Sequence, residues 1–458
     1  MSGVCIENSL TEIEQIMKSI SIYIHIPFCV KKCQYCDFLS APADSRAQEV
    51  YLRALKQEIR EQAARYREYE VQTVFIGGGT PTAVPCEKLC EVLKTVFTCY
   101  RVNPQAEISM EANPGTVTKE ALLSYRKAGI NRLSIGLQST DDGELKLLGR
   151  IHTYRDFLQT YRWAQEAGFT NINLDIMSAL PGQSVENYKK SLETVLSLRP
   201  QHISAYSLIV EEGTPFYEKY GQESEKLQAT GEKQPDLPSE EEEREMYALT
   251  EKLLAAAGYH RYEISNYALP GRECRHNLVY WKRGNYVGFG LGAASMVENV
   301  RFENTRKMQE YLAEYAGMPD AEPVSADAAQ GDEQELSNEQ EFSLREDTHS
   351  ENAQELSLRE DTHSENEQEL SIRENVHPLS PQEQMEETMF LGLRLTEGVS
   401  KAEFHRQFGV SMEQIYGEVI RKNTAKGLLI DEAGYVCLTR EGMDLSNYVM
   451  AQFLLDEV

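Results

Sequence analysis

From Ser21 onward the chain repeats one pattern: a short apolar run suited to a β-strand, then a loop, then a longer segment with helical periodicity. The runs expected to form strands occupy residues 21–26, 71–78, 106–113, 131–138, 170–177 and 202–209. The segments expected to form helices lie near residues 45–66, 86–98, 118–128, 153–167 and 184–197. Strands that alternate with helices pair in parallel through right-handed crossovers. We therefore predict an α/β fold in which residues 21–215 form the core of a partial (βα)6 barrel.

The polar and glycine-rich segments of this core gather just after the expected strands. They read CVKKCQYC, GGGTPT, EANPG, LQS and DIMSALPG. In βα barrels the loops that follow the strands meet at one rim and carry the active site. We therefore expect the candidate functional residues to lie together at one rim of the barrel.

The rest of the chain divides by composition. Residues 1–20 read as an N-terminal extension, and residues 216–318 as the segment that completes the barrel. Between 319 and 382 a 14-residue unit starting at 340, 354 and 368 repeats in a segment of Glu, Ser, Asn, Gln and Asp. Such a segment buries too little apolar surface to fold, so we predict a disordered insert. Duplication alone explains the even spacing of His349, His363 and His377, although metal binding is an alternative.

Residues 383–458 resume an ordered pattern. Helical apolar spacing returns at 386–395 and 403–409, and residues 427–442 read as a β-hairpin with its turn at Ala433–Gly434. Helices followed by a hairpin indicate a small winged-helix-like α+β domain. Because it shows no basic stripe, we expect a docking or covering role rather than DNA binding.

The charge of the chain limits its partners. Lys and Arg total 46 against 73 Asp and Glu, a formal net charge of -27. So acidic a surface repels phosphate backbones and anionic lipid headgroups, which argues against nucleic acid. No apolar run approaches the roughly 18–20 residues needed to span a bilayer, and the first twenty residues lack the order of a signal peptide. We expect a cytoplasmic protein.

Three of the nine cysteines, Cys29, Cys33 and Cys36, lie within eight residues in a C-x3-C-x2-C arrangement. Such grouping indicates metal or redox chemistry more often than disulfides in a reducing compartment. Three thiolates can each reach one iron of a [4Fe–4S] cubane while the fourth iron stays open. That iron can chelate the amino and carboxylate groups of S-adenosylmethionine, so we predict this cluster and this cofactor. A zinc site completed by Asp37 or His25 is the alternative.

This loop, GGGTPT and the six βα units resemble the radical-SAM superfamily, specifically its coproporphyrinogen oxidase-like branch. The resemblance covers nearly the whole chain except the acidic insert, and it implies a radical-SAM partial barrel. It also implies contacts to S-adenosylmethionine from Tyr23 (sulfonium), Tyr35 (adenine), Gly78, Gly79 and Thr80 (amino group), and Glu111, Gln138, Arg150 and Asp175 (carboxylate and ribose).

Two positions indicate which member of the branch this chain resembles. The oxidases carry a fourth cysteine where this chain has Phe38, and the CDF form is similar to that of HemW-type haem chaperones. The segment RHNLVYW at 275–281 resembles the HNxxYW signature of those chaperones. The resemblance implies a haem site in which His276 is the axial ligand and Tyr280 and Trp281 flank the porphyrin, with Asn277 beside them. A histidine that is only packed and hydrogen-bonded is the alternative.

Our leading hypothesis is therefore a haem chaperone that carries a [4Fe–4S] cluster and exchangeable S-adenosylmethionine and passes haem to acceptor proteins. The alternative is an enzyme, oxygen-independent coproporphyrinogen III oxidase, which decarboxylates propionate side chains; a radical-SAM enzyme acting on another tetrapyrrole is a third. Whether the protein is an enzyme stays open at this point. The resemblance also suggests a homodimer and membrane-bound haem acceptors, which no segment of the chain itself indicates.

Overall fold

The computed structural model describes residues 17–221, 235–316 and 372–455. Its centre is a sheet of strand order β12-β11-β10-β9-β1-β2-β3-β4-β5-β6-β8-β7. The six neighbouring strands β1 to β6 pair in parallel, which confirms the predicted α/β fold. They are β1 (Lys18–Ile26), β2 (Tyr69–Gly78), β3 (Val102–Ala112), β4 (Arg132–Gln138), β5 (Ile172–Ser178) and β6 (His202–Ser207).

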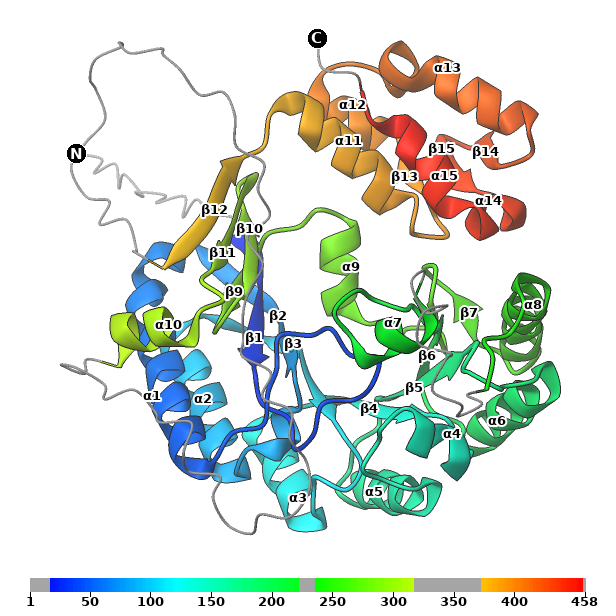
Figure 1. The fold of residues 1–458 in the computed structure, drawn as a ribbon. Helices are drawn as coiled ribbons and strands as arrows, with labels where there is room; N and C mark the ends of the chain where they lie inside the picture. The colour runs from blue at the N-terminus through cyan, green and yellow to red at the C-terminus, as the bar shows by residue number, and fades with distance from the viewer. Residues whose placement is uncertain (1–16, 222–234, 317–371, 456–458) are drawn as a thin grey trace, which may run out of the picture.

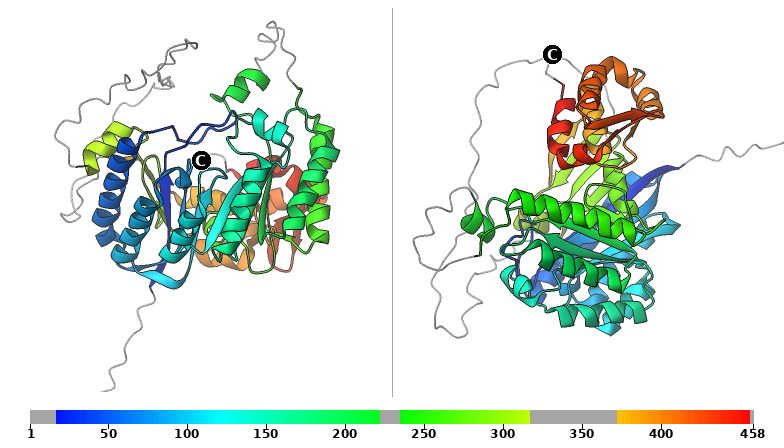
Figure 2. Two further views of the ribbon diagram at one scale, coloured as in Figure 1. Left: turned by 90° about the horizontal axis from the view of Figure 1, so that it is seen from below. Right: turned by 90° about the vertical axis from the view of Figure 1, so that its right-hand side faces the viewer.

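Helices follow these strands, and Figures 1 and 2 show them around the outside of the curved sheet. They are α1 (Ser45–Gln62), α2 (Cys86–Cys99), α3 (Lys119–Ala128), α4 (Asp142–Leu147), α5 (Tyr154–Glu166), α6 (Val185–Leu198) and α8 (Glu240–Ala256). The short α7 (Pro215–Tyr220), which follows β6, instead packs on the cysteine loop, where Phe216 N donates to Gln34 O (2.9 Å). In the described part of the chain, no helix combines the length and the apolar character that a membrane crossing requires.

Strand β1 explains how the barrel separates its core from its interior. Successive side chains of a strand point to opposite faces. Ile20, Ile22, Ile24 and Ile26 are buried in the apolar core with residues of α1. The alternate positions of β1 are polar or aromatic and point the other way, so the interior of the barrel is available for a ligand.

Further strands extend the sheet beyond β1 and β6. Strand β9 (Tyr286–Phe289) runs parallel to β1, and β10 (Ala294–Val297), β11 (Val300–Asn304) and β12 (Arg373–Pro378) continue antiparallel. At the other edge lie β8 (Asn266–Ala268) and β7 (His260–Arg261). Helices α9 (Arg275–Trp281) and α10 (Met308–Tyr315) belong to the same region. The glycines of 284–295 allow close backbone packing: a Cβ at Gly288 would lie 2.4 Å from the oxygen of Ala294.

The end of the predicted disordered insert is ordered. Residues Arg373–Pro378, in the third repeat, form β12 and pair with β11. The prediction of disorder is therefore wrong for residues 372–382, because backbone hydrogen bonds to β11 and burial of Ile372 stabilise this otherwise polar segment. His377 forms an ion pair with Glu383 (2.6 Å). The first two repeats, with His349 and His363, and residues 1–16 lie outside the described residues.

A separate C-terminal unit packs beyond α9 (Figures 1 and 2). It consists of α11 (Pro381–Gly392), α12 (Lys401–Phe408), α13 (Met412–Ala425), α14 (Arg440–Asp444), α15 (Ser446–Met450) and the strands β13 (Val399–Ser400), β14 (Leu429–Glu432) and β15 (Tyr435–Leu438). The β14–β15 hairpin turns at Ala433 and Gly434, both with positive φ, as predicted. The unit has its own apolar core, centred on side chains such as Phe404 and Tyr416.

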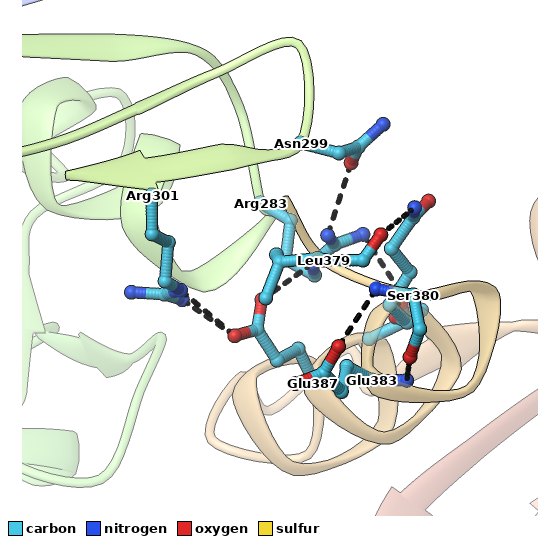
Figure 3. A network of polar contacts seen from close by, with 9 residues as sticks. Arg283, Asn299, Arg301, Leu379, Ser380, Glu383 and Glu387 are labelled. Carbon is cyan, nitrogen blue, oxygen red and sulfur yellow. Dashed lines mark hydrogen bonds and ion pairs between the residues drawn. The ribbon is translucent and has the colours of Figure 1, made fainter. Parts of the chain in front are cut away.

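Ion pairs join this C-terminal unit to the barrel. Glu387 of α11 accepts from Arg283 Nε (3.0 Å) and from Arg301 Nη2 (2.8 Å), as Figure 3 shows. Arg283 also donates to Asn299 (3.1 Å). Arg283 directly follows α9, so the network attaches the C-terminal unit next to the segment with the HNxxYW signature.

Candidate functional site

A cavity of about 670 Å³ lies inside the barrel, a volume in the usual range for small-molecule and cofactor sites. Every residue that the sequence nominated lines it, and these residues come from the cysteine loop, the strands β1 to β5 and α9. They are Tyr23, Cys29, Cys33, Tyr35, Cys36, Gly78, Gly79, Thr80, Glu111, Gln138, Arg150, Asp175, His276, Asn277, Tyr280 and Trp281. The structure thus brings the cluster motif and the HNxxYW motif into one cavity.

The cysteine loop follows β1 and is held by backbone hydrogen bonds rather than by regular structure. Cys29 N donates to Ala41 O (3.1 Å) and Gln34 N to Leu148 O (3.0 Å). Cys29, Cys33 and Cys36 are free thiols, each partly exposed. Burial, and then the neighbouring Cys33, raise the pKa of Cys36 to about 11. The loop therefore holds three unbonded thiols at the mouth of the cavity.

Other donors surround these sulfur atoms. Thr80 Oγ1 donates to Cys29 Sγ (3.6 Å), and Arg150 Nη1 donates to Cys33 Sγ (3.7 Å). Across residues 17–221, 235–316 and 372–455, no three His, Cys, Asp or Glu side chains converge on a single metal ion. A cubane does not need such convergence, because it presents a different iron to each thiolate. The donor set suits a cluster better than a mononuclear zinc site.

The glycines at the end of β2 are required by close contacts within the protein. Gly78 has a φ of +110°, and a Cβ there would lie 2.5 Å from Nδ1 of His25. At Gly79 a Cβ would lie 2.6 Å from the oxygen of Phe28 in the cysteine loop. These positions let the strand end approach the loop closely. Both glycines also line the cavity.

Glu111 is a partly exposed acid on β3 that faces the cavity. Its Oε2 accepts from the backbone nitrogen of Gly78 (3.1 Å). Burial, and then the charge of Asp175, raise the pKa of Glu111 to about 8. Asp175 on β5 accepts from Asn173 Nδ2 (2.7 Å), and burial raises its pKa as well. The raised pKa values favour the protonated acids, and a cationic ligand beside them in the cavity would favour their ionised form.

Arg150 is positioned by a residue that sequence reasoning missed. Its Nη2 donates to Asn113 Oδ1 (2.6 Å) and to Gly136 O (2.8 Å). Asn113 Nδ2 also donates to Thr80 Oγ1 (2.7 Å), so Asn113 couples the arginine to the glycine-rich strand end. The signal was present in EANPG, where Asn113 is two residues after Glu111 and so points to the same side.

Gln138 ends β4 with a φ of +71°, a backbone conformation that residues other than glycine rarely adopt. Its Oε1 accepts from the hydroxyl of Tyr206 (2.9 Å). Tyr206, on β6, is a further lining residue that sequence reasoning missed.

Helix α9 carries the HNxxYW residues and is anchored to β3. The carboxylate of Glu107 accepts from the backbone nitrogens of Arg275 and His276, both at 3.2 Å. An acid at a helix N-terminus satisfies free N–H groups and complements the helix dipole. This contact holds the histidine against β2.

His276 is 1 % exposed, and both of its ring nitrogens are hydrogen-bonded. The Thr73 hydroxyl lies 2.7 Å from Nδ1 and itself donates to Ser21 Oγ (2.8 Å). We therefore assign the proton to Nδ1, which leaves the lone pair on Nε2, 2.8 Å from the hydroxyl of Tyr280. Burial, and then the charge of Arg132, lower the pKa of His276 to about 3, so the ring is neutral.

The aromatic residues of the motif are also engaged within the protein. The ring of Tyr280 packs edge-on against those of His276 and Tyr286. The guanidinium of Arg394, from the C-terminal unit, lies 4.3 Å from the ring centre of Trp281. Both rings thus contact protein groups and also line the cavity; that they flank a porphyrin stays a prediction.

Family comparisons agree with this geometry. The model of the radical SAM superfamily matches residues 23–195, and the model of the HemN C-terminal domain matches residues 379–445. The solved structure of coproporphyrinogen III oxidase (HemN) from Escherichia coli superposes with a TM-score of 0.72 at 20% identity, covering 96% of this chain and 91% of that one. The parallel βα barrel with its three-cysteine loop therefore defines a protein of the radical-SAM class.

Curated relatives narrow this class. The chain is 35% identical over 435 residues to "Heme chaperone HemW" of Bacillus subtilis, covering 95% of this chain and 99% of that protein. It is 31% identical to the protein of the same name from Lactococcus lactis, covering 97% and 99%. The chain belongs to the HemW family of radical-SAM proteins.

Proposed function

We propose that this protein is a haem chaperone, which binds haem and transfers it to acceptor proteins. The observation that carries this proposal is the 35% identity, over 95% of the chain, to a relative named as a heme chaperone. The meeting of the HNxxYW residues and the cysteine loop in one cavity supports it. The likeness to the HemN structure, at 20% identity, speaks for the fold alone.

In this proposal Cys29, Cys33 and Cys36 hold a [4Fe–4S] cluster, and the cavity above them holds S-adenosylmethionine. Three free thiols on one loop, with donors beside the sulfurs, fit a cluster that leaves one iron open. When bound, the pair supplies one-electron chemistry. The protein's contribution is to shield the site and to present Glu111, Asp175 and Gly78 to the cofactor.

The haem in this proposal is held next to His276. Neutral imidazole is a common ligand of haem iron, and a hydrogen bond to the other ring nitrogen sets which nitrogen binds. The contact from Nδ1 to Thr73 leaves Nε2 as the nitrogen with a lone pair. Because the hydroxyl of Tyr280 lies on Nε2, iron can bind there only after Tyr280 moves.

The contact between Tyr280 and His276 predicts opposite changes in haem affinity for two variants. Tyr280→Phe removes the competing hydroxyl, so haem should bind about twofold to tenfold more tightly, as expected for the loss of one neutral hydrogen bond. His276→Ala should weaken binding and change the absorbance of the bound haem. Tyr311→Phe, which removes a buried hydroxyl bonded to Glu58 outside the cavity, serves as the control. Unchanged affinity in both cavity variants would remove His276 from the haem site.

A second arm of the experiment separates a chaperone from an oxidase. The cluster-reconstituted protein is incubated without oxygen with coproporphyrinogen III, S-adenosylmethionine and a reductant, and decarboxylated product is sought by chromatography. Phe38 stands where the oxidases carry their fourth cysteine; the residue is 63 % exposed and lines the cavity. We expect no product. Multiple turnovers would identify an enzyme of porphyrin synthesis instead.

The proposal extends to partners and location. We propose a cytoplasmic protein, because an open cluster held by thiolates requires reduced cysteines. Membrane-bound haem acceptors and a homodimer are part of the same proposal, carried only by the family resemblance. Size-exclusion chromatography with light scattering tests the dimer, and haem transfer to apo-acceptors in vesicles tests the acceptors.

A further inference from the structure

Arg132 is a buried cation whose role neither the motifs nor the family resemblance assigns. It begins β4, is 2 % exposed, and lines the same cavity as His276. The sheet register aligns it with Ser109, Phe75 and Tyr23 on the neighbouring strands. That row is three residues, or about 10 Å, before the level of Ile26 at which the cysteine loop begins. Arg132 therefore lies deeper in the barrel than the cluster site.

The guanidinium makes no hydrogen bond within the described ranges of the chain, although the nearby Cys274, Glu107 and Asp175 act on its charge and, against the effect of burial, raise its pKa. Arg132 forms no hydrogen bond and no ion pair there, and its Nε is buried without an acceptor. The nearby carboxylates are bonded elsewhere: Glu107 accepts from the N-terminus of α9, and Asp175 accepts from Asn173. The charge of Arg132 nevertheless reaches His276, whose pKa it helps to lower.

A buried arginine without hydrogen bonds is costly for a folded protein. Buried polar groups nearly always have partners, and the exceptions call for a reason such as a ligand. A planar guanidinium matches a carboxylate, to which it can donate two parallel hydrogen bonds. Asn277, which also lines the cavity, has a side-chain amide with no hydrogen bond to any described residue. Both side chains therefore offer hydrogen-bond donors to the cavity that His276 also lines.

We propose that Arg132, together with Asn277, binds a carboxylate of the ligand in this cavity, and that this carboxylate is a propionate of haem. The assignment to haem rests on the proposed function. S-adenosylmethionine also has a carboxylate, but its proposed contacts lie at the rim, on the glycine-rich strand end and Arg150. Arg132 would then orient the porphyrin so that its iron faces the histidine.

The test compares iron protoporphyrin IX with its dimethyl ester, titrated into the reconstituted full-length protein in the same detergent. Esterification removes the charge of both propionates but keeps the porphyrin and the iron. The wild-type protein should prefer the diacid by about tenfold or more, as expected for charge-assisted hydrogen bonds. Arg132→Gln should reduce that preference to less than about threefold, and Arg132→Lys should retain part of it.

Controls identify the source of the carboxylate. Arg272→Gln removes a charge from the exposed loop before α9 and should leave the preference unchanged. S-adenosylmethionine affinity is measured on every variant by equilibrium dialysis. A fall in this affinity in Arg132→Gln, with the diacid preference intact, would assign the site to S-adenosylmethionine and overturn the haem assignment.

The remaining outcomes are equally decisive. Equal binding of diacid and diester by the wild-type protein would overturn the inference without any variant, so it stays testable if Arg132→Gln does not fold. An unchanged preference in a folded Arg132→Gln would overturn it too. If the wild-type protein binds no haem, the proposed function fails and this inference fails with it.

Discussion

Glu387 should be the residue on which docking of the C-terminal unit depends most. Its two oxygens accept from Arg283 of the barrel (3.0 Å) and from Arg301 of β11 (2.8 Å). The side chains of Arg283 and Glu387 are only 4 % and 12 % exposed. Glu387→Ala would leave the buried guanidinium of Arg283 without its carboxylate. Its remaining acceptors would be Asn299 Oδ1 (3.1 Å, Figure 3) and Thr388 Oγ1 (3.5 Å).

The magnitude follows from this burial. Removing one partner of a buried ion pair typically costs about 3–5 kcal/mol, because the other charge stays buried and uncompensated. The link to Arg301 is 38 % exposed on the arginine side and contributes less. Lys282 and Glu397 provide the matched control, since they join the same two parts at 2.7 Å but are 53 % and 58 % exposed. Lys282→Ala should therefore cost no more than about 1 kcal/mol.

The assay uses the fluorescence of Trp281, which reports docking because Arg394 of the C-terminal unit packs on its ring. Trp163 is the other tryptophan of the chain and is replaced by phenylalanine in all proteins compared. Urea titration of the variants then gives the free energy of the unfolding step that exposes Trp281 to solvent. If Glu387→Ala and Lys282→Ala lower it by the same small amount, the argument from burial is wrong.

Two further predictions concern acids with raised pKa values. Glu111 is protonated below a pKa of about 8, and S-adenosylmethionine brings positive charge, so the cofactor should bind more tightly as pH rises toward about 8. Equilibrium dialysis should show this increase in affinity with pH for the wild-type protein. A Glu111→Gln variant with the same pH dependence would contradict the role of Glu111 in binding the cofactor. Glu58, held by Asn304 and Tyr311, has a pKa raised by burial from 4.5 to about 7, so the stability it confers is complete below about pH 4.5 and is lost as pH rises through about 7. The difference in unfolding free energy between wild type and Glu58→Gln should change by at most about 3 kcal/mol across that window, and a pH-independent difference would contradict the assignment.

Much of the site was predictable because its residues sit where strands end. In a parallel barrel all carboxyl ends of the strands meet at one rim, so local sequence after each strand already places Cys29, Gly78 and Glu111 together. Asn113, Glu107 and Arg132 were missed. Their roles come from partners on other strands and on α9, such as Arg150 for Asn113, and no local pattern encodes those pairs.

The third repeat also shows that local sequence does not reveal a segment's partners in the fold. Its composition predicts disorder, yet Arg373–Pro378 pairs with β11 as β12. A polar strand is stable at a sheet edge if its neighbour supplies backbone hydrogen bonds, and composition does not reveal that neighbour.

The sequence by itself determined the αβ alternation, the parallel sheet, the C-terminal hairpin and the identity of the cysteine loop, because periodicity and spacing are local properties of the chain. Only the tertiary structure decided what His276 touches. Its nitrogens face Thr73 and Tyr280, and Arg132 lies in the same cavity without a hydrogen bond to any described residue. These arrangements depend on how strands and a helix that are far apart in the chain pack together. That packing sets the distances between the side chains, and the sequence alone does not give those distances.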